Sequence, residues 1–112
     1  MEFTIRILEQ AVEFIDSLPI KMQSKVLRAI DLLREFGYTL TAPYSKSLKG
    51  TEGLKELRVK SATDICRLFY FHFRDRIYVV TSGYVKKKNE SDRREIERAV
   101  RLMREVMRKD SV

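Results

Sequence analysis

Lysine and arginine residues are frequent within Gly53–Lys88, and their side chains are the first candidates in the sequence for binding or catalysis. Three runs rich in apolar and β-branched residues predict successive strands over Leu54–Val59, Ile65–Phe73 and Arg76–Val85. The cations within these runs or at their ends are Arg58, Lys60, Arg67, Lys86, Lys87 and Lys88. Because a cation taken out of water without a partner is costly, we expect them to line an open surface or cleft. Such a surface would bind successive phosphates of a polyanion.

Cations arranged in this way could support one reaction on RNA that needs no metal ion. The ribose 2′-hydroxyl attacks the neighbouring phosphate, which requires a base for the hydroxyl, positive charge around the phosphorane and a proton donor for the leaving oxygen. Clustered lysine and arginine stabilise the phosphorane, and their mutual repulsion lowers a lysine pKa toward neutrality. Tyr84, beside the lysine run, can either stack on a base or pack in the core.

Other kinds of chemistry find little support in the sequence. It has no His–Asp–Ser or Cys–His pair suited to acyl transfer, no Gly-rich phosphate loop and no HxxH or CxxC pattern, so we expect neither a metal nor another cofactor. Alternation places His72 with Tyr70, on the opposite face from Arg67, which favours a histidine satisfied at the edge of the core over an acid–base residue. Cys66, without a histidine partner, is interpreted as an ordinary buried thiol.

The composition predicts one basic domain over residues 1–112. Its 23 Lys+Arg against 16 Asp+Glu give a net charge of +7, which favours phosphate-rich partners or acidic proteins. A single cysteine excludes a disulfide within the chain. The sequence shows neither an apolar run of membrane-spanning length nor the apolar centre of a signal peptide. We therefore expect a cytoplasmic protein that does not bind membranes.

Further elements are predicted around the cationic strands and would position them. Phe3–Leu8 alternates as an opening strand, while Glu9–Ser17 and Pro19–Phe36 have helical spacing and suggest a hairpin laid on one face of a sheet. A short edge strand over Ser47–Lys49 fits the following loop, and a final amphipathic helix begins at about Ser91. Because the links between the three cationic strands are short, we expect an antiparallel meander.

The order of these motifs resembles a known family over nearly the whole chain. The segments that carry the resemblance are PYSKSLKG (Pro43–Gly50), GLKELRVK (Gly53–Lys60), CRLFYF (Cys66–Phe71), YVKKKNESDRREIERA (Tyr84–Ala99), FIDSLP (Phe14–Pro19) and LLREFG (Leu32–Gly37). The chain is similar to RelE-type toxins of type II toxin–antitoxin systems, and most to their phage-derived, HigB-like branch. The resemblance implies an α+β RelE-like fold, in which an N-terminal strand and a two-helix hairpin pack on a mainly antiparallel sheet of about four strands, with a C-terminal helix.

The same resemblance implies an activity, partners and site residues. Such toxins are metal-independent endoribonucleases that cleave mRNA, usually on the ribosome, and a cognate antitoxin, here expected to be of the helix-turn-helix type, inhibits them. By position, Arg58 matches an arginine that contacts RNA phosphates, Arg67 the arginine that stabilises the scissile phosphate, and Lys87 a basic residue beside the leaving group. We expect these three residues to be catalytic. The other residues expected to bind RNA are Lys46, Lys49, Lys60, Tyr84, Lys86 and Lys88.

The general base stays open in the sequence. Glu56 stands where some RelE proteins have a catalytic lysine, and Arg93 lies near the position of a C-terminal tyrosine that others use. Glu56, Lys60 and Lys49 are the candidates.

Two other functions also stay open. ParE-like toxins share the fold but inhibit DNA gyrase and cleave no RNA, and the Lys86–Lys88 cluster argues for the ribonuclease branch instead. A plain nucleic-acid-binding module would use the same cations only as phosphate contacts, so that loss of any one of them would weaken binding to a similar extent.

Overall fold

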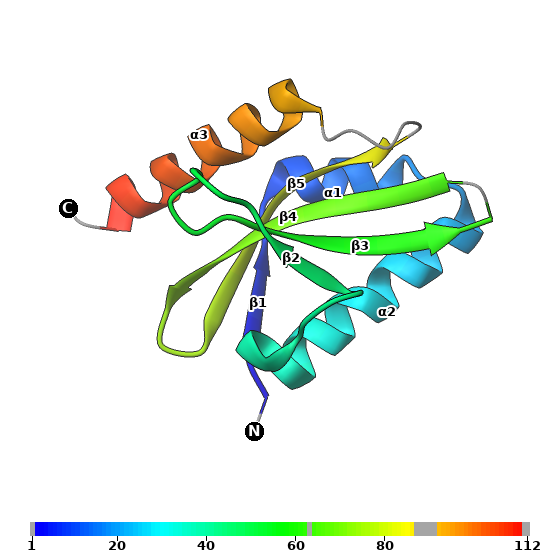
Figure 1. Ribbon diagram of the computed structural model, residues 1–112, viewed down its shortest axis with the longest axis horizontal. Helices are drawn as coiled ribbons and strands as arrows, with labels where there is room; N and C mark the ends of the chain where they lie inside the picture. The colour runs from blue at the N-terminus through cyan, green and yellow to red at the C-terminus, as the bar shows by residue number, and fades with distance from the viewer. Residues whose placement is uncertain (1, 63, 87–91, 111–112) are drawn as a thin grey trace.

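The sheet around which the chain folds has five strands in the order β1-β5-β4-β3-β2 (Figure 1). The computed structural model describes residues 2–62, 64–86 and 92–110. The strands are β1 (Thr4–Ile7), β2 (Ser45–Ser47), β3 (Lys55–Ser61), β4 (Asp64–Arg74) and β5 (Ile77–Lys86). The last three form the predicted antiparallel meander, β2 pairs antiparallel with β3 at the edge, and β1 runs parallel to β5. The predicted α+β fold is confirmed, with five strands in place of about four.

The helices begin and end close to the predicted residues. They are α1 (Glu9–Asp16), α2 (Ile20–Phe36), the 3₁₀ helix η1 (Gly37–Thr39) and α3 (Arg93–Asp110). Gly37 ends α2 with a φ of 54°, which glycine tolerates, and a Cβ there would overlap the Phe3 ring. Asp92 caps α3, since its carboxylate accepts a 2.9 Å hydrogen bond from the N–H of Arg94. Ser91, the predicted helix start, lies outside the described residues. No helix among the described residues is both long enough and apolar enough to cross a membrane.

The edge strand begins earlier than the sequence predicts. A strand over Ser47–Lys49 was expected, whereas β2 begins at Ser45. The Ser45 side chain is buried, and its hydroxyl lies 2.6 Å from that of Tyr70, which fixes the position of β2 on the sheet. After β2 the chain forms a loop, which is closed by a hydrogen bond from the N–H of Leu48 to the carbonyl of Leu54. A buried serine does not contribute to the apolar periodicity from which strands are predicted, so the start of β2 could not be predicted from the sequence.

Helices cover the two faces of the sheet unequally. α1 and α2 pack on one face and form a continuous apolar core with the strands. This core includes Ala11, Ile15, Val26, Leu33, Leu57, Leu68, Tyr70 and Val80. α3 lies on the opposite face (Figure 1), where Ala99 and Met103 pack with Phe69, Phe71 and Val79. Because α3 contacts chiefly β4 and β5, the rest of that face is left for polar side chains.

Gly83 allows β5 to lie close to α1 and to the neighbouring strand. A Cβ at this position would lie 2.7 Å from the Phe14 ring and 2.8 Å from the carbonyl oxygen of Arg67. Gly83→Ala should therefore lower the free energy of unfolding by about 1–3 kcal/mol, measured by urea titration, because a helix or a paired strand must shift.

A double-mutant cycle tests the stated cause of this loss. In a Phe14→Leu background the alanine should cost less, because the smaller side chain relieves one of the two overlaps. Strictly additive costs would show that the close approach of α1 is not what requires Gly83.

Candidate active site

The register of the meander brings the predicted cations to one face of the sheet. Arg58, Arg67 and Tyr84 lie directly opposite one another across β3, β4 and β5. Residues opposite one another in an antiparallel sheet share a face, as do alternate residues along a strand. The charged side chains of β2, β3, β4 and β5 that share this face near Arg67, together with Tyr84, are Lys46, Glu56, Arg58, Lys60, Arg67 and Lys86. We call these seven residues the cationic face; they occupy the side of the sheet that α3 covers only in part.

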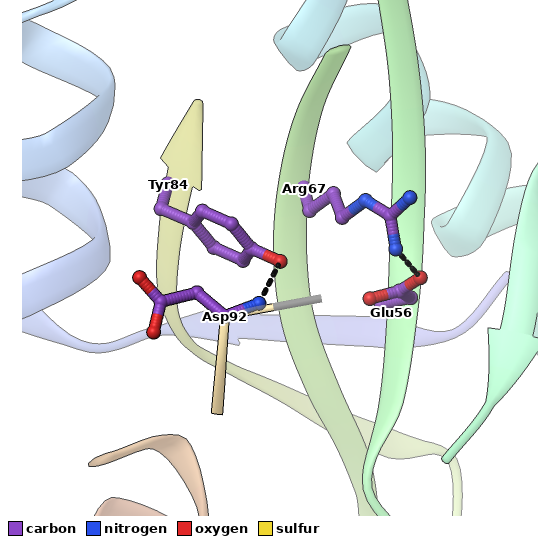
Figure 2. Close-up of polar contacts among 4 residues, drawn as sticks. All are labelled: Glu56, Arg67, Tyr84 and Asp92. Carbon is purple, nitrogen blue, oxygen red and sulfur yellow. Dashed lines mark hydrogen bonds and ion pairs between the residues drawn. The ribbon is translucent and has the colours of Figure 1, made fainter. Parts of the chain in front are cut away.

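A buried ion pair lies at the centre of the cationic face. An Nη1 atom of Arg67 lies 2.5 Å from Oε1 of Glu56, and the side chains are 3% and 0% exposed. Figure 2 shows Arg67 reaching from β4 toward Glu56 on β3. The other carboxylate oxygen, Oε2 of Glu56, is buried and accepts no hydrogen bond from the residues that the structure describes. Buried charges of this kind are tolerated only as pairs, so each partner holds the other in place.

Lys86 lies beside this pair at the end of β5. Its side chain is 4% exposed. Loss of hydration lowers the pKa of Lys86 most, and the positive charge of Arg67 lowers it further. Two other cations, Arg58 and Lys46, add to the lowering, while the carboxylate of Glu56 opposes it. The expected lowering of a lysine pKa is thus found at Lys86, with burial as a larger cause than repulsion.

The expectation of an open cationic surface is right for some residues and wrong for others. Lys46 and Lys60 are exposed, and Arg58 is half-buried. Arg67 and Lys86 are buried, which corrects the prediction for both. The reason for Arg67 is Glu56, whose carboxylate replaces water around the guanidinium group.

Tyr84 joins the cationic face to α3. Its half-buried ring stacks on Phe69 with 5.7 Å between centroids and 20° between planes. Its hydroxyl accepts a 3.2 Å hydrogen bond from the N–H of Asp92, just before α3 begins (Figure 2). The tyrosine therefore packs against the core through its ring and fixes the start of α3 through its hydroxyl. Whether it also stacks on a base stays a prediction.

Several candidates from the sequence lie away from the cationic face or outside the described residues. Lys49 lies in the loop after β2 and lines a separate pocket with α3. His72 is exposed, and its Nε2 lies 2.8 Å from the carbonyl oxygen of Asp75. It is satisfied, as expected, although it lies outside the core. Lys87 and Lys88 are outside the described residues.

Cys66 is buried, as the sequence predicts. Burial raises the pKa of its thiol to about 12. A thiol of this kind stays protonated at neutral pH and is a poor nucleophile.

Sequence reasoning named Glu56 and Arg67 separately and missed their pairing. A signal was present, because alternation along β3 puts Glu56 on the same face as Arg58 and Lys60. One carboxylate among several cations on a predicted strand face indicates a paired charge. The partner could not be identified, since the register between β3 and β4 depends on a turn that residue types alone do not fix.

Comparison with known proteins shows the family and the fold of the chain. A family model described as "Phage derived protein Gp49-like" matches residues 13–104. No curated protein matches the chain significantly. The fold is similar to that of a mutant of the E. coli toxin RelE in the free state, with a TM-score of 0.64 and 19% identity over 90% of this chain and 97% of that one.

Two further solved structures are similar. One is an archaeal RelE–RelB complex from Pyrococcus horikoshii, with a TM-score of 0.56 and 19% identity over 80% of this chain and 100% of that one. The other is the RelBE2 toxin–antitoxin complex from Mycobacterium tuberculosis, with a TM-score of 0.57 and 19% identity over 77% of this chain and 100% of that one. The expected kinship with RelE is confirmed: the chain belongs to the phage-derived Gp49-like family and has the RelE fold.

Proposed function

We propose that the protein is the toxin of a type II toxin–antitoxin system and an endoribonuclease that cleaves mRNA during translation. The observation that carries this proposal is the meeting of Arg58, Arg67 and Lys86 around Glu56 on one face of a RelE fold. Two guanidinium groups supply positive charge for a phosphorane, and a lysine with a lowered pKa supplies a proton.

The reaction needs only proton transfers and charge stabilisation. The ribose 2′-hydroxyl gives up its proton, and its oxygen bonds to the neighbouring phosphorus. The bond from phosphorus to the 5′-oxygen then breaks, and that oxygen takes up a proton. The products are a 2′,3′-cyclic phosphate and a 5′-hydroxyl end. In this mechanism Arg58 and Arg67 stabilise the phosphorane, and Lys86 protonates the leaving oxygen, with Lys87 as a second donor.

Glu56 is the general base that the geometry favours among the three candidates. Lys49 lies in a loop against α3, and Lys60 is exposed toward the end of β3. Glu56 lies between the cations, and its Oε2 atom accepts no hydrogen bond from the described residues. That oxygen is the acceptor for a 2′-hydroxyl proton once RNA reaches the pair.

The proposed partners are mRNA on the ribosome and a cognate antitoxin of the helix-turn-helix type. Support for an antitoxin comes from two of the similar structures, which are complexes of RelE-type proteins with RelB-type partners. A net charge of +7 suits both an RNA substrate and an acidic inhibitor. These partners place the protein in the cytoplasm.

The burial of Arg67 favours a second candidate function. An arginine that is 3% exposed and bound to Glu56 is not presented to solvent. If that pair never opens, the cationic face binds RNA through Lys46, Arg58 and Lys60 and does not cleave it. The protein would then be a nucleic-acid-binding module.

Ribosomes carrying an end-labelled mRNA separate the two functions. The wild-type protein should cut the message and leave a 2′,3′-cyclic phosphate on the upstream fragment, whereas the Arg67→Ala variant should not. An intact message with the wild-type protein would refute the nuclease. Similar losses of RNA binding in Arg58→Ala and Lys60→Ala, without any cutting by the wild-type protein, would support the binding module.

A further inference from the structure

A second basic site lies next to the cationic face, in a pocket of about 650 Å³ between α3 and the loop that follows β2. Figure 1 shows this loop rising from the sheet toward α3. The pocket has an apolar floor formed by Leu48, Ile96 and Val100, which are half-buried. We call it the loop–α3 pocket.

The rim of the loop–α3 pocket is mostly positive. Lys49 from the loop and Arg93 and Arg101 from α3 line it, and all three are exposed. Arg104 also lines it, but this side chain is held by Glu52 in two hydrogen bonds of 2.6 and 3.2 Å. Only one carboxylate, that of Glu97, is among the lining residues. An apolar floor below a cationic rim suits a flat ring that carries an anionic group.

Two contacts hold the loop of the pocket in place before any ligand binds. The Thr51 side chain is buried, and its hydroxyl donates to the carbonyl of Leu48 at 2.5 Å. The ion pair between Glu52 and Arg104 ties the same loop to α3. The backbone of the loop therefore loses little conformational entropy when a ligand binds.

Along the chain, residues of the pocket closely follow residues that belong to or contact the cationic face at two points. Lys46 of the cationic face precedes Lys49 by three residues, a reach of about 10 Å along the chain. Arg93 directly follows Asp92, whose N–H is bound by Tyr84 of the cationic face. A strand of RNA lying on the cationic face would therefore meet the pocket within a few nucleotides.

We propose that the loop–α3 pocket is a subsite for a nucleotide of the RNA strand outside the step that is cleaved. The base lies on the floor of Leu48, Ile96 and Val100, and phosphate oxygens contact Lys49, Arg93 and Arg101. This assignment rests on the proposed RNA substrate. It gives Lys49 a place in binding that is distinct from the chemistry at Glu56.

Non-cleavable 2′-O-methyl oligonucleotides test the subsite through the effect of length, with affinity measured by fluorescence anisotropy. A decanucleotide should bind wild-type protein more tightly than a dinucleotide does. In the Arg93→Ala/Arg101→Ala variant this gain should shrink by roughly tenfold, and the salt dependence for the decanucleotide should become less steep. A decanucleotide with abasic riboses keeps its phosphates and should lose much of the gain on wild-type protein, because it has no base for the apolar floor.

The matched control is Lys21→Ala/Lys25→Ala, which removes the same charge from exposed positions of α2, on the far side of the sheet. It should keep the gain with length. An unchanged gain in the Arg93/Arg101 variant, or an abasic strand that binds as tightly as the normal one, would overturn the subsite. The subsite would also be overturned if the Arg93→Ala/Arg101→Ala variant bound RNA of every length normally but no longer bound poly-glutamate. The pocket would then take an acidic protein segment.

These results separate the subsite from the proposed function. If wild-type protein shows the gain with length but never cuts ribosome-bound mRNA, the subsite stands and the nuclease fails. If the protein cuts mRNA but affinity does not depend on length, the nuclease stands and the subsite fails.

Discussion

Replacement of Arg67 by alanine should reduce the rate of mRNA cleavage by roughly 10²–10³-fold, because a positively charged donor to the phosphorane is lost. The same change removes the buried partner of Glu56 and should lower the free energy of unfolding by about 3–5 kcal/mol. Single-turnover cleavage of ribosome-bound mRNA measures the first effect, and urea unfolding measures the second. Lost activity in this variant alone is ambiguous, because an unstable protein also cleaves poorly.

A second variant separates catalysis from stability at this pair. Glu56→Met/Arg67→Met replaces both charges with apolar side chains of similar length, and such replacements of buried ion pairs are often neutral or stabilising. We expect a folded protein that is as stable as the wild type but has lost cleavage. If the double variant instead keeps wild-type cleavage, Glu56 and Arg67 hold the fold together and take no part in the reaction.

Replacement of Lys86 by methionine should have opposite effects on activity and stability. Cleavage should fall by roughly 10²–10⁴-fold, as expected when a proton donor is removed. Stability should rise, because the lowered pKa of Lys86, caused first by loss of hydration and then by Arg67, means that the folded protein disfavours the ammonium form. A rise in melting temperature together with lost cleavage would identify a residue kept for chemistry.

The pH dependence of the cleavage rate shows whether Lys86 donates or accepts a proton in the reaction. A proton donor works in its charged form, so the rate of cleavage should fall as pH rises through the lowered pKa of Lys86. In Lys86→Arg the charge persists to much higher pH, so this alkaline fall should move upward or vanish. A rate that instead rises through this range would make Lys86 a base.

The difference in the free energy of unfolding between Lys86→Met and the wild type should also change with pH. Below the folded-state pKa of Lys86 the buried ammonium costs stability in full, and the cost disappears as pH rises toward the ordinary value of 10.5. The advantage of the methionine variant should therefore be greatest near neutral pH and should shrink under alkaline conditions. A constant advantage would point to packing as its cause.

Periodicity along the chain was enough to predict most of the architecture. α2 has a strong local pattern because it buries one continuous stripe, and β4 and β5 have long apolar runs because both of their faces are buried along much of their length. The parallel pairing of β1 with β5 was not predicted, since the partners lie some seventy residues apart, as Thr4 and Ile77 do. Local patterns contain no information about such long-range pairing.

The composition of the cationic face could be predicted from the sequence, but its electrostatics could not. Alternation alone puts Arg58 and Lys60 on one face and separates Arg67 from His72. Burial of Arg67 and Lys86 depends on how Glu56 and the end of β5 meet across three strands. That geometry decides which cations face water, and residue types leave it undetermined.

The carboxylate of Glu56 has a consequence for RNA in general, because it is an anion already bound to Arg67. A phosphate group can bind Arg67 only by displacing the Glu56 carboxylate. Because this carboxylate belongs to the same chain, its effective concentration at Arg67 is high and does not depend on the protein concentration. RNA that binds nonspecifically therefore contacts mainly the exposed Lys46 and Lys60, together with the half-buried Arg58. The protein should bind cellular RNA more weakly than its charge of +7 suggests, and only a strand held against the sheet by further contacts competes successfully for Arg67.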